Sequence, residues 1–136
     1  LVSSLEIDFA QVKSGYELAY RLLAYHAIKD NMDTDGICIL DTEEGDLQGC
    51  AKAAERFDNL ALLAMDMSDA KRAKWLIVLK GKYGKLDFNA SVRPLLAKIN
   101  AKGGGRSPAF QGVASCEDKE AVSQFKKDFR RACLSL

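Results

Sequence analysis

Apolar segments of strand length alternate along this chain with amphipathic segments of helix length, and that alternation restricts the fold more than any other feature. Three apolar runs have the length of buried strands: Ile37–Leu40, Leu60–Met67 and Trp75–Leu79. Three further segments carry apolar residues at helical spacing: Leu47–Phe57, Ser91–Asn100 and Lys119–Leu134. Strands that alternate with helices in 136 residues predict an α/β single domain with a mixed central sheet flanked by helices.

The connections between these segments refine the prediction. The polar segment Ser68–Lys74 is short, so we expect the second and third apolar runs to form an antiparallel hairpin. We expect a basic loop at Gly81–Lys85 and a further strand at Phe110–Ala114.

The N-terminal part begins with a helix signal. Ser14 and Glu17 form an S-x-x-E capping box, which predicts a helix from Gly15 to Asp30. We therefore divide the chain into a helical segment, residues 1–35, packed on a globular domain, residues 36–136, with a glycine-rich loop. Since the chain begins with Leu1 and not with methionine, we expect it to be a piece of a longer protein.

The charge is divided between the two halves of the chain. Residues 1–69 hold five basic and fourteen acidic side chains, a net charge of −9, and residues 70–136 hold fifteen basic and five acidic ones, a net charge of +10. The stretch Ala70–Leu86 has six Lys or Arg and no acid. This asymmetry favours a polyanionic partner for the second half, unless the fold interleaves the halves and cancels the field.

The cysteines argue against a metal site. No two of them have CxxC spacing, and the chain has one histidine, His26, so a four-ligand zinc site is not expected. We predict no catalytic residue, no metal ligand and no cofactor in this chain. Instead we expect reduced, buried thiols in an intracellular protein: Cys38, Cys50, Cys116 and Cys133. No apolar run approaches the ~20 residues that span a bilayer, so no membrane partner is expected.

A run of three glycines, Gly103, Gly104 and Gly105, is the sharpest local feature. We expect it to end the helix over residues 91–100, which Asn89 or Ser91 would cap and which would hold Pro94 in its first turn. Three glycines also allow backbone N–H groups to converge on an anion or the backbone to approach another segment closely. The flanking Lys102 and Arg106 would add positive charge for a phosphate.

The second half of the chain resembles the DHH-associated domain and, more closely, the C-terminal domain of alanyl-tRNA synthetases. In that family a helix ends in a glycine run, an Ala-Gln-Gly-like turn follows, and then come a strand and the last helix. Here the run is Gly103-Gly104-Gly105-Arg106 and the turn is Ala109-Phe110-Gln111-Gly112, with Phe110 inserted. Phosphodiesterase relatives usually carry His where Arg106 stands, which favours the synthetase branch. The resemblance extends over residues 36–136.

The resemblance implies a non-catalytic C-terminal domain of an alanine–tRNA ligase that binds the tRNA elbow and links aminoacylation with editing. The implied partners are alanine-accepting tRNA, the other domains of the parent synthetase and a second copy in a homodimer. The ATP and zinc of the parent enzyme would be held by those other domains. The expected location is the cytoplasm, with the mitochondrion left open.

The implied tRNA contacts are mostly to phosphate and sugar. The candidate residues, with Tyr83 assigned to stacking on an exposed base and Gln111 to a sugar or base, are Gly103, Gly104, Gly105, Arg106, Lys102, Lys82, Lys85, Gln111 and Tyr83. The cationic face of the last helix is a weaker candidate, since such a face is often only solvated: Lys126, Lys127, Arg130 and Arg131. Trp75, within a strand run, is expected in the core.

Two other functions remain open at this point. One is the substrate-binding half of a DHH-type phosphodiesterase, whose metal-binding Asp/His motifs would lie upstream. The other is a protein-interaction or dimerisation module in which RNA binding has weakened, for which the acidic first half would supply the surface.

Overall fold

A computed structural model describes residues 22–42 and 46–136 of the chain. A helix over residues 22–31 precedes ten further elements. These are β1 (Ile37–Thr42), α2 (Asp46–Ala54), β2 (Leu60–Asp66), β3 (Arg72–Lys80), the short 3-10 helix η1 (Gly81–Lys85), the π-helical turn η2 (Phe88–Val92), α3 (Arg93–Ala97), β4 (Lys102–Arg106), β5 (Ala109–Ser115) and α4 (Lys119–Leu134).

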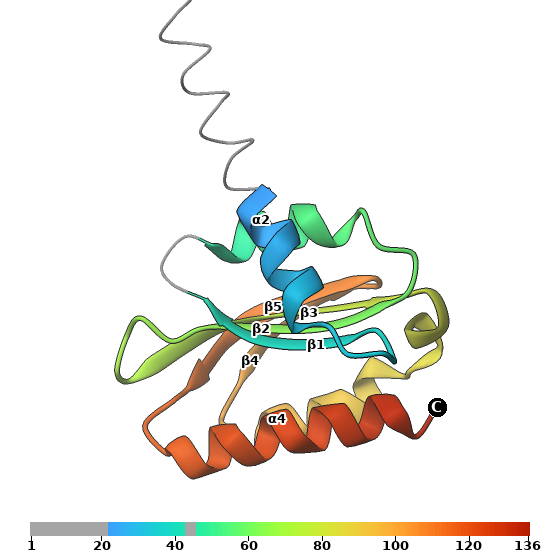
Figure 1. Cartoon of the computed structure of the whole chain (residues 1–136). Helices are drawn as coiled ribbons and strands as arrows, with labels where there is room; N and C mark the ends of the chain where they lie inside the picture. Colours follow the sequence, from blue (N-terminus) through green and yellow to red (C-terminus); the bar gives the residue numbers. More distant parts are fainter. Residues whose placement is uncertain (1–21, 43–45) are drawn as a thin grey trace, which may run out of the picture.

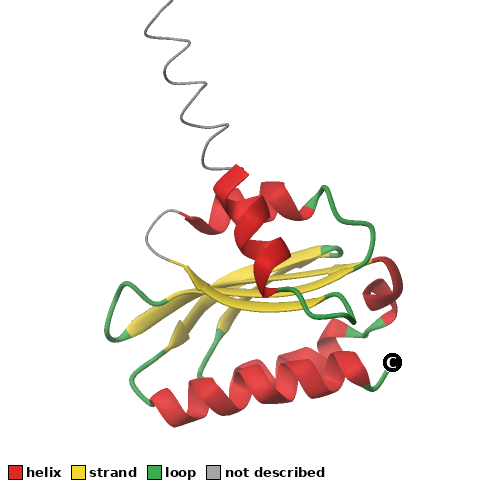
Figure 2. Cartoon of the chain, viewed as in Figure 1, coloured by secondary structure: helices red, strands yellow, loops and turns green. Residues whose placement is uncertain are grey.

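The strands of the described residues form one five-stranded mixed sheet in the order β1-β2-β3-β5-β4. β1 and β2 pair in parallel, as expected for strands joined through the helix α2, and every other pairing is antiparallel. The predicted α/β architecture is confirmed, and so is the antiparallel hairpin of β2 and β3 (Figure 2).

Helices cover the two faces of the sheet unequally. The helix over residues 22–31 and α2 lie on one face, and α3 and α4 lie on the other (Figure 1). The α3–α4 face buries the larger core, to which β5 contributes Phe110 and Ala114. The core beneath α2 takes side chains from β1, β2 and β3, and its described members include none from β4 or β5. The α2 face of β5 is therefore left without a helix among the described residues.

Strand β3 is longer than predicted. We expected a turn through Lys74, but Arg72, Ala73 and Lys74 already pair with β5, and Lys74 also pairs with β2. The turn is tightened by Asp69, whose carboxylate accepts the backbone N–H groups of Lys71 and Arg72 at 2.8 and 3.4 Å. Arg72 and Lys74 are polar because they lie on the solvent-facing side of the strand, and for that reason the sequence did not predict a strand here. At the other end of β3, the expected loop Gly81–Lys85 forms the helix η1.

The helix before the glycine run begins and ends at other residues than predicted. Asp87, and not Asn89 or Ser91, caps its first turn by accepting the N–H groups of Asn89 and Ala90. Pro94 lies in the first turn of α3, as expected. The chain turns away at Asn100, which adopts a left-handed φ of 51°, so an asparagine ends this segment before the glycines begin.

The glycine run is an edge strand and not the predicted loop. Gly103, Gly104 and Gly105 lie in β4 and pair with β5. A Cβ on Gly103 would stand 2.3 Å from the carbonyl oxygen of Gln111, and φ there is 136°. The glycines thus serve the close approach of one strand to another, the second of the two roles that the sequence suggested.

The cysteines are buried as predicted, and all four are thiols outside any disulfide: Cys38, Cys50, Cys116 and Cys133. Burial raises the pKa of Cys38 and of Cys133 to about 12, so both stay protonated at neutral pH. Trp75 is in the core, as expected.

Some predictions concern residues outside the described part. The capping box at Ser14 and Glu17 lies outside the described residues, and so does the predicted helix from Gly15 through residue 21. The division of the chain at residue 35 stays a prediction.

We predict that Gly103→Ala lowers the free energy of unfolding by about 2 kcal/mol, because alanine is strained at this φ and its methyl group meets a backbone carbonyl. Gly104→Ala is the matched control: its Cβ would meet only the end of the Arg93 side chain, at 3.4 Å, and the change is expected to stay within about 0.5 kcal/mol. Urea denaturation measures both. Equal losses for the two variants would contradict the close-approach role of Gly103.

Candidate nucleic-acid interface

One face of β5 is open to solvent, because no described helix packs on it. Strand geometry sends alternate side chains of β5 to opposite sides of the sheet. Phe110 and Ala114 are buried against the α3–α4 layer, whereas Gln111 and Val113 are exposed on the other side. Val113 is 45% exposed, which is high for an apolar residue in the interior of a sheet. The exposed side of β5 can therefore be reached by a ligand.

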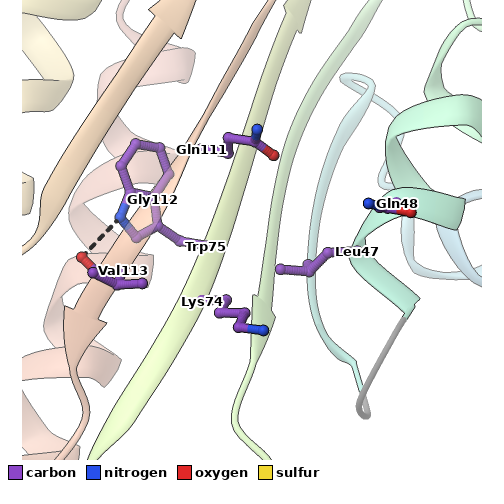
Figure 3. Close-up of a pocket in the computed structure, with 7 residues that line it drawn as sticks. All are labelled: Leu47, Gln48, Lys74, Trp75, Gln111, Gly112 and Val113. Carbon is purple, nitrogen blue, oxygen red and sulfur yellow. Dashed lines mark hydrogen bonds between the residues drawn. The ribbon is translucent and has the colours of Figure 1, made fainter.

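A hollow of about 550 Å³ lies between the first turn of α2 and β5, with β3 as its floor (Figure 3). Its described lining residues are Leu47, Gln48, Lys74, Trp75, Gln111, Gly112 and Val113. The indole Nε1–H of Trp75 donates to the carbonyl oxygen of Val113 at 3.2 Å, which adds a tie between β3 and β5 at this point. The floor of the hollow is therefore held by the sheet and by a side chain from the core.

A second hollow, of about 440 Å³, adjoins the first and shares Val113 with it. Its described lining residues are Lys71, Arg72, Asn100, Lys102, Val113, Ala114, Ser115 and Glu117. Lys74 pairs in register with Val113, and Val113 with Lys102, so two lysines flank one exposed valine across three strands. We call the surface of Lys71, Arg72, Lys74, Lys102, Gln111 and Val113 the open sheet face.

Acids near the open sheet face reduce its positive charge but do not reverse it. Asp66, opposite Lys74 on β2, is buried and accepts hydrogen bonds from the hydroxyl and the N–H of Ser68, at 2.6 and 3.0 Å. These bonds hold the pKa of Asp66 below its usual range, so it stays charged beside Lys74. Glu117 borders the second hollow, where three cations outnumber it.

The structure brings together only part of the predicted site. Lys102 and Gln111 lie on the open sheet face, and Arg106 is exposed at the end of β4. Lys82 and Lys85 are exposed in η1 and line neither hollow. The candidate cations are thus divided between β4, which borders the open sheet face, and η1, which does not line either hollow.

Tyr83 does not fit its predicted role as a stacking platform. Its side chain is 1% exposed, and its hydroxyl donates a hydrogen bond to the backbone carbonyl of Asp35. Burial raises the pKa of Tyr83. The ring belongs to the core and joins η1 to the loop before β1, and the carbonyl of Asp35 satisfies its hydroxyl group.

The last helix uses part of its positive charge inside the fold. Lys126 binds Asp41 at 2.7 Å, and Arg130 pairs with Asp33. The basic second half and the acidic first half therefore meet at α4. Their opposite charges cancel there in part, which is the alternative that the sequence left open. Lys127 and Arg131 remain exposed on α4.

Sequence reasoning missed Arg72 and Lys74 as members of the candidate site. The signal was present, since both belong to the acid-free basic stretch Ala70–Leu86. Their polarity predicts a turn, and only the pairing of β5 with both β3 and β4 brings them near Lys102.

Within residues 22–42 and 46–136, no group of three or more His, Cys, Asp or Glu could hold a metal ion. In the same residues no helix is long and apolar enough to cross a bilayer.

Comparison with known proteins gives one kind of result for the sequence and another for the structure. No protein-family model matches the chain, and no curated protein matches it. A solved structure does match: the C-Ala domain of alanyl-tRNA synthetase from Aquifex aeolicus, at 18% identity and a TM-score of 0.54, over 73% of this chain and 95% of that one. The chain has the C-Ala fold.

The C-Ala fold is the one that the sequence resemblance implied. At 18% identity the likeness shows the fold alone.

We predict that Tyr83→Phe lowers the free energy of unfolding by about 1 kcal/mol, because the part-buried hydrogen bond from the buried Tyr83 to the carbonyl of Asp35 is lost. Tyr25→Phe is the control, since the half-buried Tyr25 ring stacks on Phe57 and a loss of its hydroxyl should change stability by no more than about 0.5 kcal/mol. Urea titration distinguishes the two. A Tyr83→Phe protein as stable as the parent would refute the bracing role.

Proposed function

We propose that this chain is a non-catalytic, tRNA-binding C-terminal domain of an alanine–tRNA ligase and that it binds RNA with the open sheet face. The single observation that carries the proposal is the group of three cations, Arg72 and Lys74 on β3 and Lys102 on β4, which flanks the face of β5 that no described helix covers. The likeness to the C-Ala domain of an alanyl-tRNA synthetase supports the tRNA assignment.

The chemistry of this face suits a polynucleotide backbone. Phosphates are recognised mainly by Lys and Arg, and a cluster of such side chains on neighbouring strands suits a chain of closely spaced anions. Lys74, Val113 and Lys102 are in register across three strands, so the sheet fixes the backbone that carries two of these cations. Arg106, at the end of β4, and Lys82 and Lys85, in η1, would lengthen the contact beyond the open sheet face.

The finer parts of the proposal come from the resemblance in the glycine strand and the residues that follow it. The domain would bind the tRNA elbow and link the aminoacylation and editing sites, which other domains of the parent enzyme would hold together with their ATP and zinc. Recognition of the elbow by shape and phosphate contacts would make affinity depend on tRNA folding more than on its sequence.

We predict that the affinity for alanine tRNA falls steeply with salt, with a log–log slope of about −0.7 to −0.9 for each phosphate neutralised. Fluorescence anisotropy between about 50 and 200 mM salt measures the slope, with an unrelated tRNA titrated alongside. Similar slopes for both tRNAs are expected, since the contacts are to the backbone. An absence of binding to either tRNA at the lowest salt would end the proposal.

We predict that Arg72→Glu and Lys102→Glu each weaken tRNA binding by about tenfold and reduce the salt slope by about one phosphate. Lys127→Glu is the matched control, because it makes the same charge change at an exposed position of α4, across the sheet. Its effect is expected to stay below about threefold, through the long-range field alone. A larger loss for Lys127→Glu than for Arg72→Glu would move the interface to α4.

A second candidate function, a dimerisation module, is favoured by two adjacent leucines. Leu22 and Leu23 are 49% and 66% exposed at the start of the described helix. Exposed apolar side chains that form a contiguous patch are a feature of protein contact sites. Sizing chromatography over a range of concentrations tests it: a mass that rises with concentration and falls for Leu23→Gln supports the module, and a constant monomer mass contradicts it.

A further inference from the structure

We propose that the hollow between α2 and β5 binds a single unpaired nucleobase of the RNA strand whose phosphates lie on the adjoining cationic hollow. This inference rests on the proposed RNA-binding function and names what the open sheet face takes besides phosphate. It assigns a base-binding role to Leu47, Gln48, Gln111 and Val113.

The lining of this hollow has the chemistry of a base edge and a base face. Gln48 from α2 and Gln111 from β5 each present an amide with two N–H donors and one carbonyl acceptor (Figure 3). A nucleobase edge carries donors and acceptors side by side, and glutamine amides are among the groups that bind them in pairs. Leu47 and Val113 supply apolar surface for the ring faces, which explains an exposed valine in the middle of a cationic surface.

The two hollows differ in charge, and this difference suits the first to a base and the second to a phosphate. Of the described residues that line the first hollow, Lys74 alone has a charged side chain, and the others have amide or apolar groups. The second hollow has three cations, Lys71, Arg72 and Lys102. A nucleotide has the same division, a planar uncharged base joined to an anionic phosphate, and the two hollows meet at Val113.

The size of the hollow also fits. Its volume of about 550 Å³ lies within the range of roughly 300–1,000 Å³ that is typical of small-molecule sites. The paired strands β3 and β5 form the floor of the hollow, and the first turn of α2 stands on one side of it. A base that is already unpaired would enter at little cost, whereas a base within a duplex would first have to be unstacked.

The test compares two ligands of equal charge: a single-stranded RNA hexamer of adenylates and a ribose-phosphate chain of the same length without bases. The full chain is expected to bind the adenylate hexamer about tenfold more tightly than the abasic chain. In the double variant with Gln48→Ala and Gln111→Ala, the two affinities are expected to become equal at the abasic value. Gln124→Ala, which removes the same kind of amide from α4, is the control and should keep the tenfold difference.

A second measurement does not depend on variants. The side-chain NH₂ resonances of Gln48 and Gln111 should shift in NMR spectra on addition of the adenylate hexamer, and the abasic chain should leave them in place. If the parent chain binds both strands equally and with the same salt slope, the base-binding inference fails while the RNA-binding function stands. If neither strand nor alanine tRNA binds at low salt, the RNA-binding function fails and this inference fails with it.

Discussion

The antiparallel pairing of β5 with β3 is the contact on which the other features of this molecule depend. β3 is the middle strand of the sheet, and β5 attaches to it the whole C-terminal part, with β4 on its outer side and α4 after it. The indole of Trp75 reinforces this pairing from within the core by donating to the carbonyl of Val113. Because β5 has only one face buried, the same pairing that stabilises the fold also creates the open sheet face.

The glycine strand shows how a local sequence feature acquires its role from its neighbours. Gly103 and Gly105 have left-handed φ values of 136° and 154°, and a side chain at either would collide with the backbone of β5. The edge strand can therefore lie close to β5, and Lys102 is brought into register with Val113 and Lys74. The contribution of the glycines to a binding surface is thus indirect: they position a neighbouring lysine.

The uneven charge of the chain is used in two ways. At α4 the basic side chains meet acids of the first half, and the ion pairs of Lys126 and Arg130 join α4 to β1 and to the loop that precedes it. On β3 and β4 the cations of the second half face solvent. The described residues that line the second hollow include three cations and one acid, Glu117. Cancellation on one face and accumulation on the other explain how a chain of net charge +1 can present a basic surface.

The sequence by itself determined the architecture, because periodicity reports which side chains must leave water. The apolar runs placed β1, β2 and most of β3, and the stripe of Val122, Phe125 and Phe129 placed α4 at its observed bounds. Burial of the thiols and of Trp75 followed from the same argument.

Only the tertiary structure decided which cations share a face. Lys102, Arg72 and Lys74 are up to thirty residues apart, and strand pairing aligns them, whereas Tyr83, which is near Lys82 in sequence, turns into the core toward the carbonyl of Asp35. Local patterns report whether a residue prefers water. They carry no information about register between distant strands, because register is set by contacts that exist only once the chain has folded.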